Sequence, residues 1–379
     1  MWVLWNEIRK IFTWKILPLL ILVNFVLYFI RIEFYITNFP NGSGVYSYNI
    51  AVEMVDQYGT QMDDGEFLDF KKSYDEQVKE ADLYLQARKE FRDLGIETYE
   101  QFRNYSPFDN ANEKLDALHN KVMFEEEVEL FWELQERARL INFHEAKKKI
   151  PSNVNDKQLR RYEEIFAQKQ YEEYSGVAIE NFKEFITYVA IAILYSVVLV
   201  ISPMILKDRS RQIVALQYTS KKGRNLYKTK ILAGIISTFM VITALLIVYF
   251  SFYASNNTSM FFEVPINAFI AMGNPTWYNL TFFQYILLCV AAIYVIGFVY
   301  GLLAMSFSSI VPNTMTLIGI QIPFVIGIII FGMNPLIHFI ISIGYPQWLA
   351  PTAYSVMIVV SVLFSIVLWR SEKKRDIVL

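Results

Sequence analysis

Residues 185–206, FITYVAIAILYSVVLVISPMIL, contain no Lys, Arg, Asp or Glu. A helix rises about 1.5 Å per residue, so about 20 mostly apolar residues cross the roughly 30 Å hydrocarbon core of a bilayer. The run is too long for a buried strand, and a helix bonds its own backbone groups inside lipid. We therefore expect an all-α membrane protein with six transmembrane helices. The other five expected spans are about 16–36, 231–253, 283–305, 314–332 and 352–369.

The stretch that follows this run is strongly basic. Residues 206–230 read LKDRSRQIVALQYTSKKGRNLYKTK and hold eight Lys or Arg residues against one Asp. Short basic segments next to spans stay on the cytoplasmic side of a membrane. The pattern predicts that both termini and the loop 207–230 are cytoplasmic. Basic residues that flank the first and last spans agree with this: Arg9, Lys10, Lys15, Arg370, Lys373, Lys374 and Arg375.

An even number of spans with both termini inside leaves residues 37–184 as an insert on the outer side. This insert has 31 acidic against 19 basic residues. Apolar residues recur at three- and four-residue spacing along 66–94, which is typical of a helix. A second helix of about forty residues, roughly 60 Å long, is expected between Asp109, which can cap it, and Pro151, which can stop it. The insert should be an extracellular helical hairpin or small bundle.

Helix ends in this insert can also be predicted from capping residues. Gly95 is placed to end the first helix of the insert, because glycine readily adopts the left-handed conformation of a C-terminal cap. Thr98 and Gln101 have the spacing of a capping box, which opens a short helix. A third long helix is expected to begin near Asn155 or Asp156 and to run directly into the second span.

The first fifteen residues, MWVLWNEIRKIFTWK, predict an amphipathic helix. Such a helix lies in the headgroup plane of a membrane with its apolar face toward lipid. We expect residues 1–15 to form an interfacial helix ahead of the first span. Helical spacing sets Trp2, Trp5, Ile8 and Phe12 toward lipid and Asn6, Glu7, Arg9 and Lys10 toward water.

Sequence motifs for catalysis are missing. No Gly-x-x-x-x-Gly-Lys-Ser/Thr segment is present, so the chain lacks the common phosphate loop of an ATPase. The single cysteine, Cys289, excludes an intrachain disulfide and a cysteine-built metal site. His119 and His144 lack the spacing of zinc ligands and are expected at solvated helix positions, and His338 is expected at the membrane interface. We predict a protein that is not an enzyme and has no cofactor, metal or nucleic-acid partner of its own.

The order of these features resembles the permease subunit of an ABC-2 type transporter. The likeness covers the six spans and leaves the insert unassigned. In the loop after the second span, that family has an acidic residue, a short apolar helix, a Thr/Ser turn, a basic pair and a Lys that enters the next span. Near the last span, WLAPTAY (348–354) is similar to the family's approach to its final helix, with Ala350 where Asn is common. The loop order is matched here by Asp208, 213–216, 219–220, 221–224 and Lys230.

The resemblance implies that loop 207–230 contains a coupling helix, which docks into a groove of a separate ATPase subunit that holds ATP and Mg²⁺. It also implies a second permease chain, identical or different, in a dimer. An apolar ridge inside the loop fits docking, whereas its positive charges are also explained by topology alone. The helix 1–15 is then either a brace for this contact or a plain anchor. The expected coupling residues are Asp208, Arg211, Ile213, Val214, Leu216, Gln217, Lys221 and Arg224.

Ionisable residues are missing from the middle of the spans, where a proton-driven transporter needs one. Segment 333–351, which contains three prolines, is too interrupted to cross a membrane and is expected to dip back into the outer leaflet. Six residues are candidates for a polar pathway or for helix packing: Gly297, Tyr300, Gly301, Asn313, Gln321 and Pro323.

Two functions fit this sequence. The first is the permease subunit of an ATP-driven exporter in a bacterial plasma membrane, where its spans contact membrane lipid. It would move an amphipathic or hydrophobic substrate, such as an antimicrobial peptide or a lipid-like molecule. The acidic insert suits a cationic peptide. The alternative is a membrane-anchored receptor or assembly factor whose acidic insert binds a partner. Six spans favour transport, because an anchor needs only one.

Overall fold

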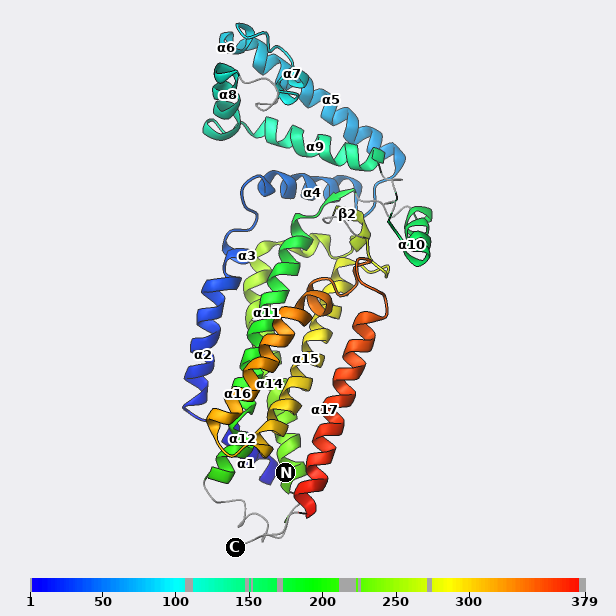
Figure 1. Cartoon of the computed structure of the whole chain (residues 1–379). Coiled ribbons are helices and arrows are strands. Elements are labelled where there is room, and N and C mark those ends of the chain that lie inside the picture. The colour runs from blue at the N-terminus through cyan, green and yellow to red at the C-terminus, as the bar shows by residue number, and fades with distance from the viewer. Residues whose placement is uncertain are drawn as a thin grey trace.

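The computed structural model describes residues 2–105, 112–146, 150, 153–168, 173–210, 223, 226–270 and 275–374. Regular structure in these ranges is almost all helical, as the apolar segments predict. Figure 1 shows a long helical bundle with a smaller helical unit at one end. We call the end that carries this unit the insert end, and the opposite end the α1 end.

Five helices are long and apolar enough to cross a membrane, and each overlaps a predicted span. A sixth candidate is the first predicted span together with the helix before it. α1 (Trp2–Ile11) and the helix that starts at Ile16 meet at a bend of 50°, and together they are long and apolar enough to cross a membrane. The chain is therefore a multi-pass membrane protein with five or six spans. The five helices are α11 (Val177–Ile201), α14 (Leu226–Tyr253), α15 (Phe282–Ile310), α16 (Thr314–Gly327) and α17 (Leu349–Lys374).

Several spans are extended by short helical pieces. The first predicted span consists of α2 (Ile16–Leu27), the π-helix η1 (Tyr28–Ile32) and α3 (Phe34–Thr37). α11 is followed directly by α12 (Pro203–Ser210). The turns after α14 are η4 (Ala254–Asn256), η5 (Thr258–Phe261) and η6 (Ile266–Ala268).

The segment predicted to dip back into the membrane begins with a short helical piece that follows the fifth span. After α16, the π-helices η7 (Ile328–Gly332) and η8 (Asn334–His338) carry the chain on toward the insert end (Figure 1). Pro335 is tolerated because it lies in the first turn of η8, where its missing N–H is not needed. The expectation that segment 333–351 dips back into the outer leaflet remains a prediction.

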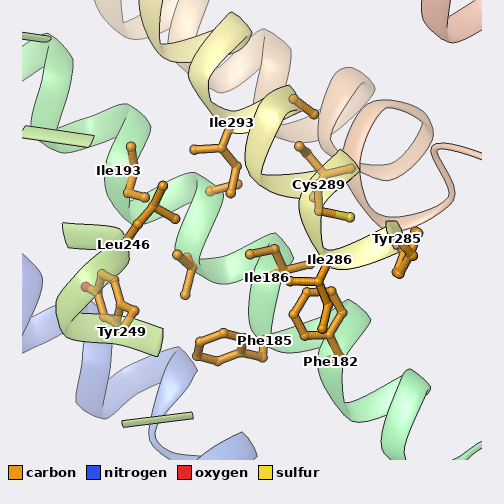
Figure 2. Packing of buried hydrophobic residues seen from close by; sticks show 14 of the residues in the cluster. Phe182, Phe185, Ile186, Ile193, Leu246, Tyr249, Tyr285, Ile286, Cys289 and Ile293 are labelled. Atoms are coloured by element: carbon orange, nitrogen blue, oxygen red, sulfur yellow. The ribbon is translucent and has the colours of Figure 1, made fainter. Parts of the chain in front are cut away.

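The core of the bundle is built around α11, which packs against α2, α14 and α15. By contrast, α17 leaves apolar side chains such as Val359 (54% exposed) and Leu363 (55%) uncovered, as expected for a helix that faces lipid. Figure 2 shows the core side chains Phe182, Phe185, Ile186 and Ile193 of α11, Leu246 and Tyr249 of α14, and Tyr285, Ile286, Cys289 and Ile293 of α15.

A buried polar network attaches the peripheral helix α2 to this core. The Asn24 side-chain amide donates a hydrogen bond to Ser196 Oγ of α11 at 2.8 Å. The Tyr249 hydroxyl of α14 donates to Asn24 Oδ1, also at 2.8 Å. Hydrogen bonds between spans specify which helix faces fit together, because lipid offers polar groups no alternative partner.

Two glycines let α14 and α15 approach closely. A Cβ atom added at Gly297 would lie 2.5 Å from Ile242 Cδ1. One added at Gly301 would lie 2.7 Å from Thr238 Oγ1 and 3.3 Å from Thr238 Cγ2. Thr238 is short and branched at Cβ, so it has little freedom to move away. Packing of α14 on α15 therefore depends on the missing side chain at position 301.

We expect Gly301→Ala to destabilise the bundle by about 1–3 kcal/mol, the usual cost of forcing an extra group into a packed core. Thermal unfolding of the purified chain in detergent measures this. Gly319→Ala in α16 is the matched control, because nothing lies within 4 Å of a Cβ atom added there. The packing argument fails if both substitutions shift the unfolding temperature equally.

The insert has a helical arm above a helix that lies across the bundle (Figure 1). The crossing helix is α4 (Gly44–Tyr58), and the arm is a hairpin of α5 (Asp64–Ala87) and α9 (Glu129–Ala146). Short elements close the tip of the arm: α6 (Lys89–Arg92), α7 (Tyr99–Arg103), α8 (Glu113–Asn120) and the π-helix η2 (Lys121–Glu125). The arm has its own core, formed by Ala81, Leu85, Phe91, Tyr99, Phe102, Val122, Met123, Phe131 and Leu134.

The predicted helix starts at Thr98 and Asn155 are confirmed, but the lengths of the long helices of the insert were predicted wrongly. Thr98 and Asn155 both form complete capping boxes, with Gln101 and Gln158. The helix predicted over 66–94 ends at Ala87, because Arg88 is extended.

Gly95, at φ +73°, lies after the next short helix. The break at Arg88 directs the side chain of Phe91 into the core of the arm. The predicted forty-residue helix is also divided. Asn112 caps α8, and Glu127, at φ +46°, separates η2 from α9. The expected cap Asp109 and stop Pro151 lie outside the described residues.

The last helix of the insert fastens it to the bundle. α10 (Asp156–Ala167) ends before α11 begins, so the prediction that it continues into the second span was wrong. Its buried Arg161 donates from Nε to the Thr276 carbonyl at 2.8 Å, and Gln158 Nε2 donates to the Ile343 carbonyl at 2.9 Å. β1 (Tyr174–Ser175) pairs in parallel with β2 (Phe269–Ile270). The insert is thus bonded to the segments before α15 and after η8.

Candidate functional site

A buried ionic cluster lies at the α1 end, where the two arms of the predicted coupling loop leave the bundle. Asp208 is near the end of α12, and Lys230 is in the second turn of α14. Lys230 Nζ donates to Asp208 Oδ2 at 2.5 Å, and both residues are 4% exposed. Two charges are removed from water at low cost only when they are closely paired. The pair therefore holds the two arms of the loop together.

α1 adds a second pair to this cluster. Lys10 Nζ lies 2.7 Å from Glu7 Oε1 and 3.7 Å from Asp208 Oδ2. The ionic cluster, as the term is used below, consists of Glu7, Lys10, Asp208 and Lys230. It joins three segments that are far apart in sequence: α1, α12 and the start of α14.

The packing of α1 corrects the prediction that Glu7 faces water and Ile8 faces lipid, while the placement of this helix in the headgroup plane remains a prediction. Glu7 is 4% exposed, because Lys10 neutralises its charge, and Ile8 is 7% exposed. α1 packs on α14, with Ile11 also buried. Trp2 and Trp5 are exposed, and their contact with lipid remains a prediction.

Arg209 fixes the arm that leaves α12. Its guanidinium donates to the carbonyl groups of Ser309 and Val311 at the end of α15, the latter at 3.1 Å. It also lies 3.8 Å from Glu372 of α17. On the other arm, Lys228 Nζ lies 4.3 Å from the centre of the Trp369 ring, also in α17. Both arms of the loop are therefore tied to the last span.

Of the eight predicted coupling residues, Asp208 lies within the described part of the chain. The other seven, Arg211, Ile213, Val214, Leu216, Gln217, Lys221 and Arg224, lie outside the described residues. Their role remains a prediction from the sequence.

A groove of about 670 Å³ lies between α11, α12 and α16 in the half of the bundle nearest α1. Ser202 Oγ donates to Gln321 Oε1 at 2.8 Å across it. Gln321 is 7% exposed, and its Nε2 has no hydrogen-bond partner among the described residues. Lys207 and Ser210 line the end of the groove nearest α1. Most of the wall is apolar and includes Val198, Leu199, Leu317, Ile318, Ile322 and Val325.

The other predicted pathway residues lie around this groove or on nearby helices. Pro323 is inside α16 and has no N–H to donate to the carbonyl of Gly319. The Tyr300 hydroxyl donates to the Phe324 carbonyl at 3.1 Å and so ties α15 to α16. Asn313 caps α16 by accepting from the Thr316 N–H at 2.9 Å. Gly297 and Gly301 face α14, as described above.

Sequence reasoning missed Glu7, Lys10 and Ser202 as site residues. A usable signal was present for the ionic cluster. Glu7 is the only acidic residue in segment 1–15, and Asp208 is the only one in segment 206–230. A single carboxylate in a basic, membrane-adjacent segment has several cations available for pairing. No comparable signal identifies the groove, because an apolar span has the same composition on every face.

The histidines are not arranged for catalysis. His144 is buried, stacks on Phe67 at 3.5 Å between ring centres, and has Nδ1 3.2 Å from Glu173 Oε1. His119 stacks on Phe102 at 4.7 Å. The prediction of a solvated position was therefore wrong for His144, whereas His119 is half-buried. Across the described ranges, no group of three or more His, Cys, Asp or Glu side chains is placed to hold a metal ion.

The comparison with family models identifies the class of the protein. The model described as "ABC-2 family transporter protein" matches residues 10–369. The chain therefore belongs to the ABC-2 transporter family and is a permease that works with an ABC ATPase subunit. Searches of curated proteins and of solved structures found no match.

Proposed function

We propose that this permease exports an amphipathic substrate, and that the groove between α11 and α16 is the part of its route that first receives it. The observation that carries this is the buried Gln321 amide, which has an unpartnered donor in an otherwise apolar wall. A buried donor without a partner is costly, so a ligand that supplies an acceptor is stabilised there. The volume of about 670 Å³ is typical of small-molecule sites.

The residues that line the groove and its position support an amphipathic substrate and transport out of the cell. Its wall suits an apolar body, and Lys207 suits an anionic or carbonyl group at the α1 end. The basic loop predicts that this end faces the cytosol. A groove there is placed to take substrate from the inner leaflet, which fits export across a bacterial plasma membrane. The acidic insert, predicted to lie outside, would meet cationic substrates such as antimicrobial peptides.

Energy would come from a separate ATPase subunit through the loop 207–230. The ionic cluster supports this, because it joins both arms of the loop to α1, and Arg209 and Lys228 join them to α15 and α17. Displacement of the loop would then move several spans together. A second permease chain would complete the route. The alternative, a receptor held by inert spans, is not favoured, because the family match covers the spans themselves.

We expect Gln321→Leu to weaken ligand binding in the groove by about fivefold to tenfold, the effect of losing a hydrogen bond worth roughly 1 kcal/mol. The probe is a fluorescent phospholipid analogue, titrated against the purified chain in detergent. Gln135→Leu, at an exposed position of the insert, is the control. Equal affinity for the wild type and Gln321→Leu would remove the groove from the proposed route.

A further inference from the structure

Three aromatic side chains form a continuous surface where the arm meets α4. The Tyr46 and Trp132 rings are parallel, with centres 5.9 Å apart, and the Phe124 ring stands edge-on to Trp132 at 5.6 Å. The Trp132 indole N–H donates to the Met123 carbonyl at 2.8 Å, which fixes the orientation of its ring. Phe124 is 61% exposed. We call these three residues the aromatic strip.

Carboxylates border the aromatic strip. Glu127, Glu129 and Glu133 lie on the segment that carries Phe124 and Trp132, and Trp132 stacks on Tyr46. Burial raises the pKa of Tyr46, and these three carboxylates raise it further. Glu127 and Glu129 are exposed and have no ion pair within the described ranges.

Two basic residues near the strip are engaged with other carboxylates, whereas a third, Arg137, opposes the rise that burial causes in the pKa of Glu133. Arg88 lies 2.6 Å from a carboxylate oxygen of Glu126, and Lys121 lies 3.3 Å from one of Glu90. They therefore do not neutralise the carboxylates beside the strip. The exposed Phe124 ring and the half-buried Tyr46 and Trp132 rings therefore adjoin two exposed carboxylates, Glu127 and Glu129, that have no ion pair in the described ranges.

We propose that the aromatic strip, with Glu127 and Glu129, is a docking surface for the Lys or Arg side chains of an amphipathic cationic peptide. This rests on the proposed export of an amphipathic, cationic substrate and names where the insert first binds it. An inorganic cation needs only the carboxylates. Aromatic faces favour an organic cation, whose charge is attracted by the ring and whose stem packs on it.

The place of the strip in the fold connects it to the bundle. Tyr46 belongs to α4, which lies between the arm and the spans (Figure 1). Two residues further on, the Tyr48 hydroxyl donates to the Asn257 carbonyl at 3.2 Å, beyond the end of α14. Ile50 and Met54 of the same helix are buried in the main core. A peptide bound to the strip would therefore contact α4, a helix that is packed into the membrane domain.

The test measures binding of a labelled helical peptide of Leu and Lys, about twenty residues long, to the full chain in nanodiscs of neutral lipid, with empty nanodiscs subtracted. We expect Trp132→Leu and Phe124→Ala each to weaken binding by about tenfold. Glu127→Gln with Glu129→Gln should weaken it and flatten its dependence on salt. Phe124 is mostly exposed, so its loss should leave folding intact, as circular dichroism can verify.

Glu76→Gln with Glu80→Gln on α5 removes the same charge from elsewhere on the arm and is the matched control. The inference is overturned if this control weakens binding as much as the pair beside the strip, or if Phe124→Ala leaves the affinity unchanged. It is also overturned if the wild type binds the Lys peptide no better than a peptide with Gln in place of Lys. ATPase association and phospholipid binding by the same samples report on the proposed function separately, so failure of the strip would leave that function standing.

Discussion

Asp208→Ala is expected to destabilise the α1 end by about 3–5 kcal/mol and to reduce substrate-stimulated ATP hydrolysis at least tenfold. The substitution removes the carboxylate that accepts from Lys230 at 2.5 Å and faces Lys10 at 3.7 Å. The buried cluster would then hold two cations, Lys10 and Lys230, and only one carboxylate, Glu7. The arms of the loop would separate, and displacement of the loop would no longer reach α14. Thermal unfolding and hydrolysis by the complex with its ATPase subunit measure the two effects.

Two further variants separate this mechanism from a general loss of charge. Asp208→Glu keeps the carboxylate and should retain most of the stability. Lys71→Ala breaks the pair with Glu145, in which both side chains are about half exposed, so it should cost no more than about 1 kcal/mol. If Asp208→Ala is no more damaging than Lys71→Ala, the ionic cluster does not hold the loop in place.

The spans could be predicted from the sequence because lipid imposes a simple rule. A segment that crosses must be continuously apolar over about 20 residues, whatever its neighbours are. Segments such as 185–206 and 283–305 show this directly. The capping boxes at Thr98 and Asn155 were predictable for a related reason, since a cap is formed by residues three apart.

The helix breaks of the insert follow no such local rule. Neither Arg88 nor Glu127 is a turn-forming residue, yet the chain leaves the helical conformation at both. At these points burial of Phe91 and Phe131 in the core of the arm outweighs the local preference. The complete set of residues in the ionic cluster could also not be predicted from the sequence, because only the packing of α1 on α14 brings Glu7 and Lys230 into one cluster.

The groove shows a different limit of sequence reasoning. Gln321 stood out as a polar residue in an apolar span, but its neighbours alone could not distinguish a packing role from a binding role. In the structure its side-chain oxygen accepts from Ser202, whereas its nitrogen has no partner in the described part of the chain, and the binding role belongs to the proposal above. Such a division requires the positions of both α11 and α16.

Leu216→Asp is expected to abolish association with the ATPase subunit, lowering recovery in a pulldown at least tenfold. The residue belongs to the predicted apolar ridge of the coupling helix, and the family match makes an ATPase partner part of the function. A carboxylate pressed into an apolar groove loses its hydration without gaining a partner, which costs several kcal/mol. Membrane insertion should be unaffected, because the position lies between spans.

Asn225→Asp, in the same loop but off the ridge, introduces the same charge and should leave association close to the wild-type level. The comparison distinguishes contact by the ridge from attraction by the basic residues around it. If both variants lose the ATPase equally, charge rather than the ridge dominates the contact, and high salt should then release the wild-type complex as well. If Leu216→Asp still binds, the coupling contact lies elsewhere at the α1 end.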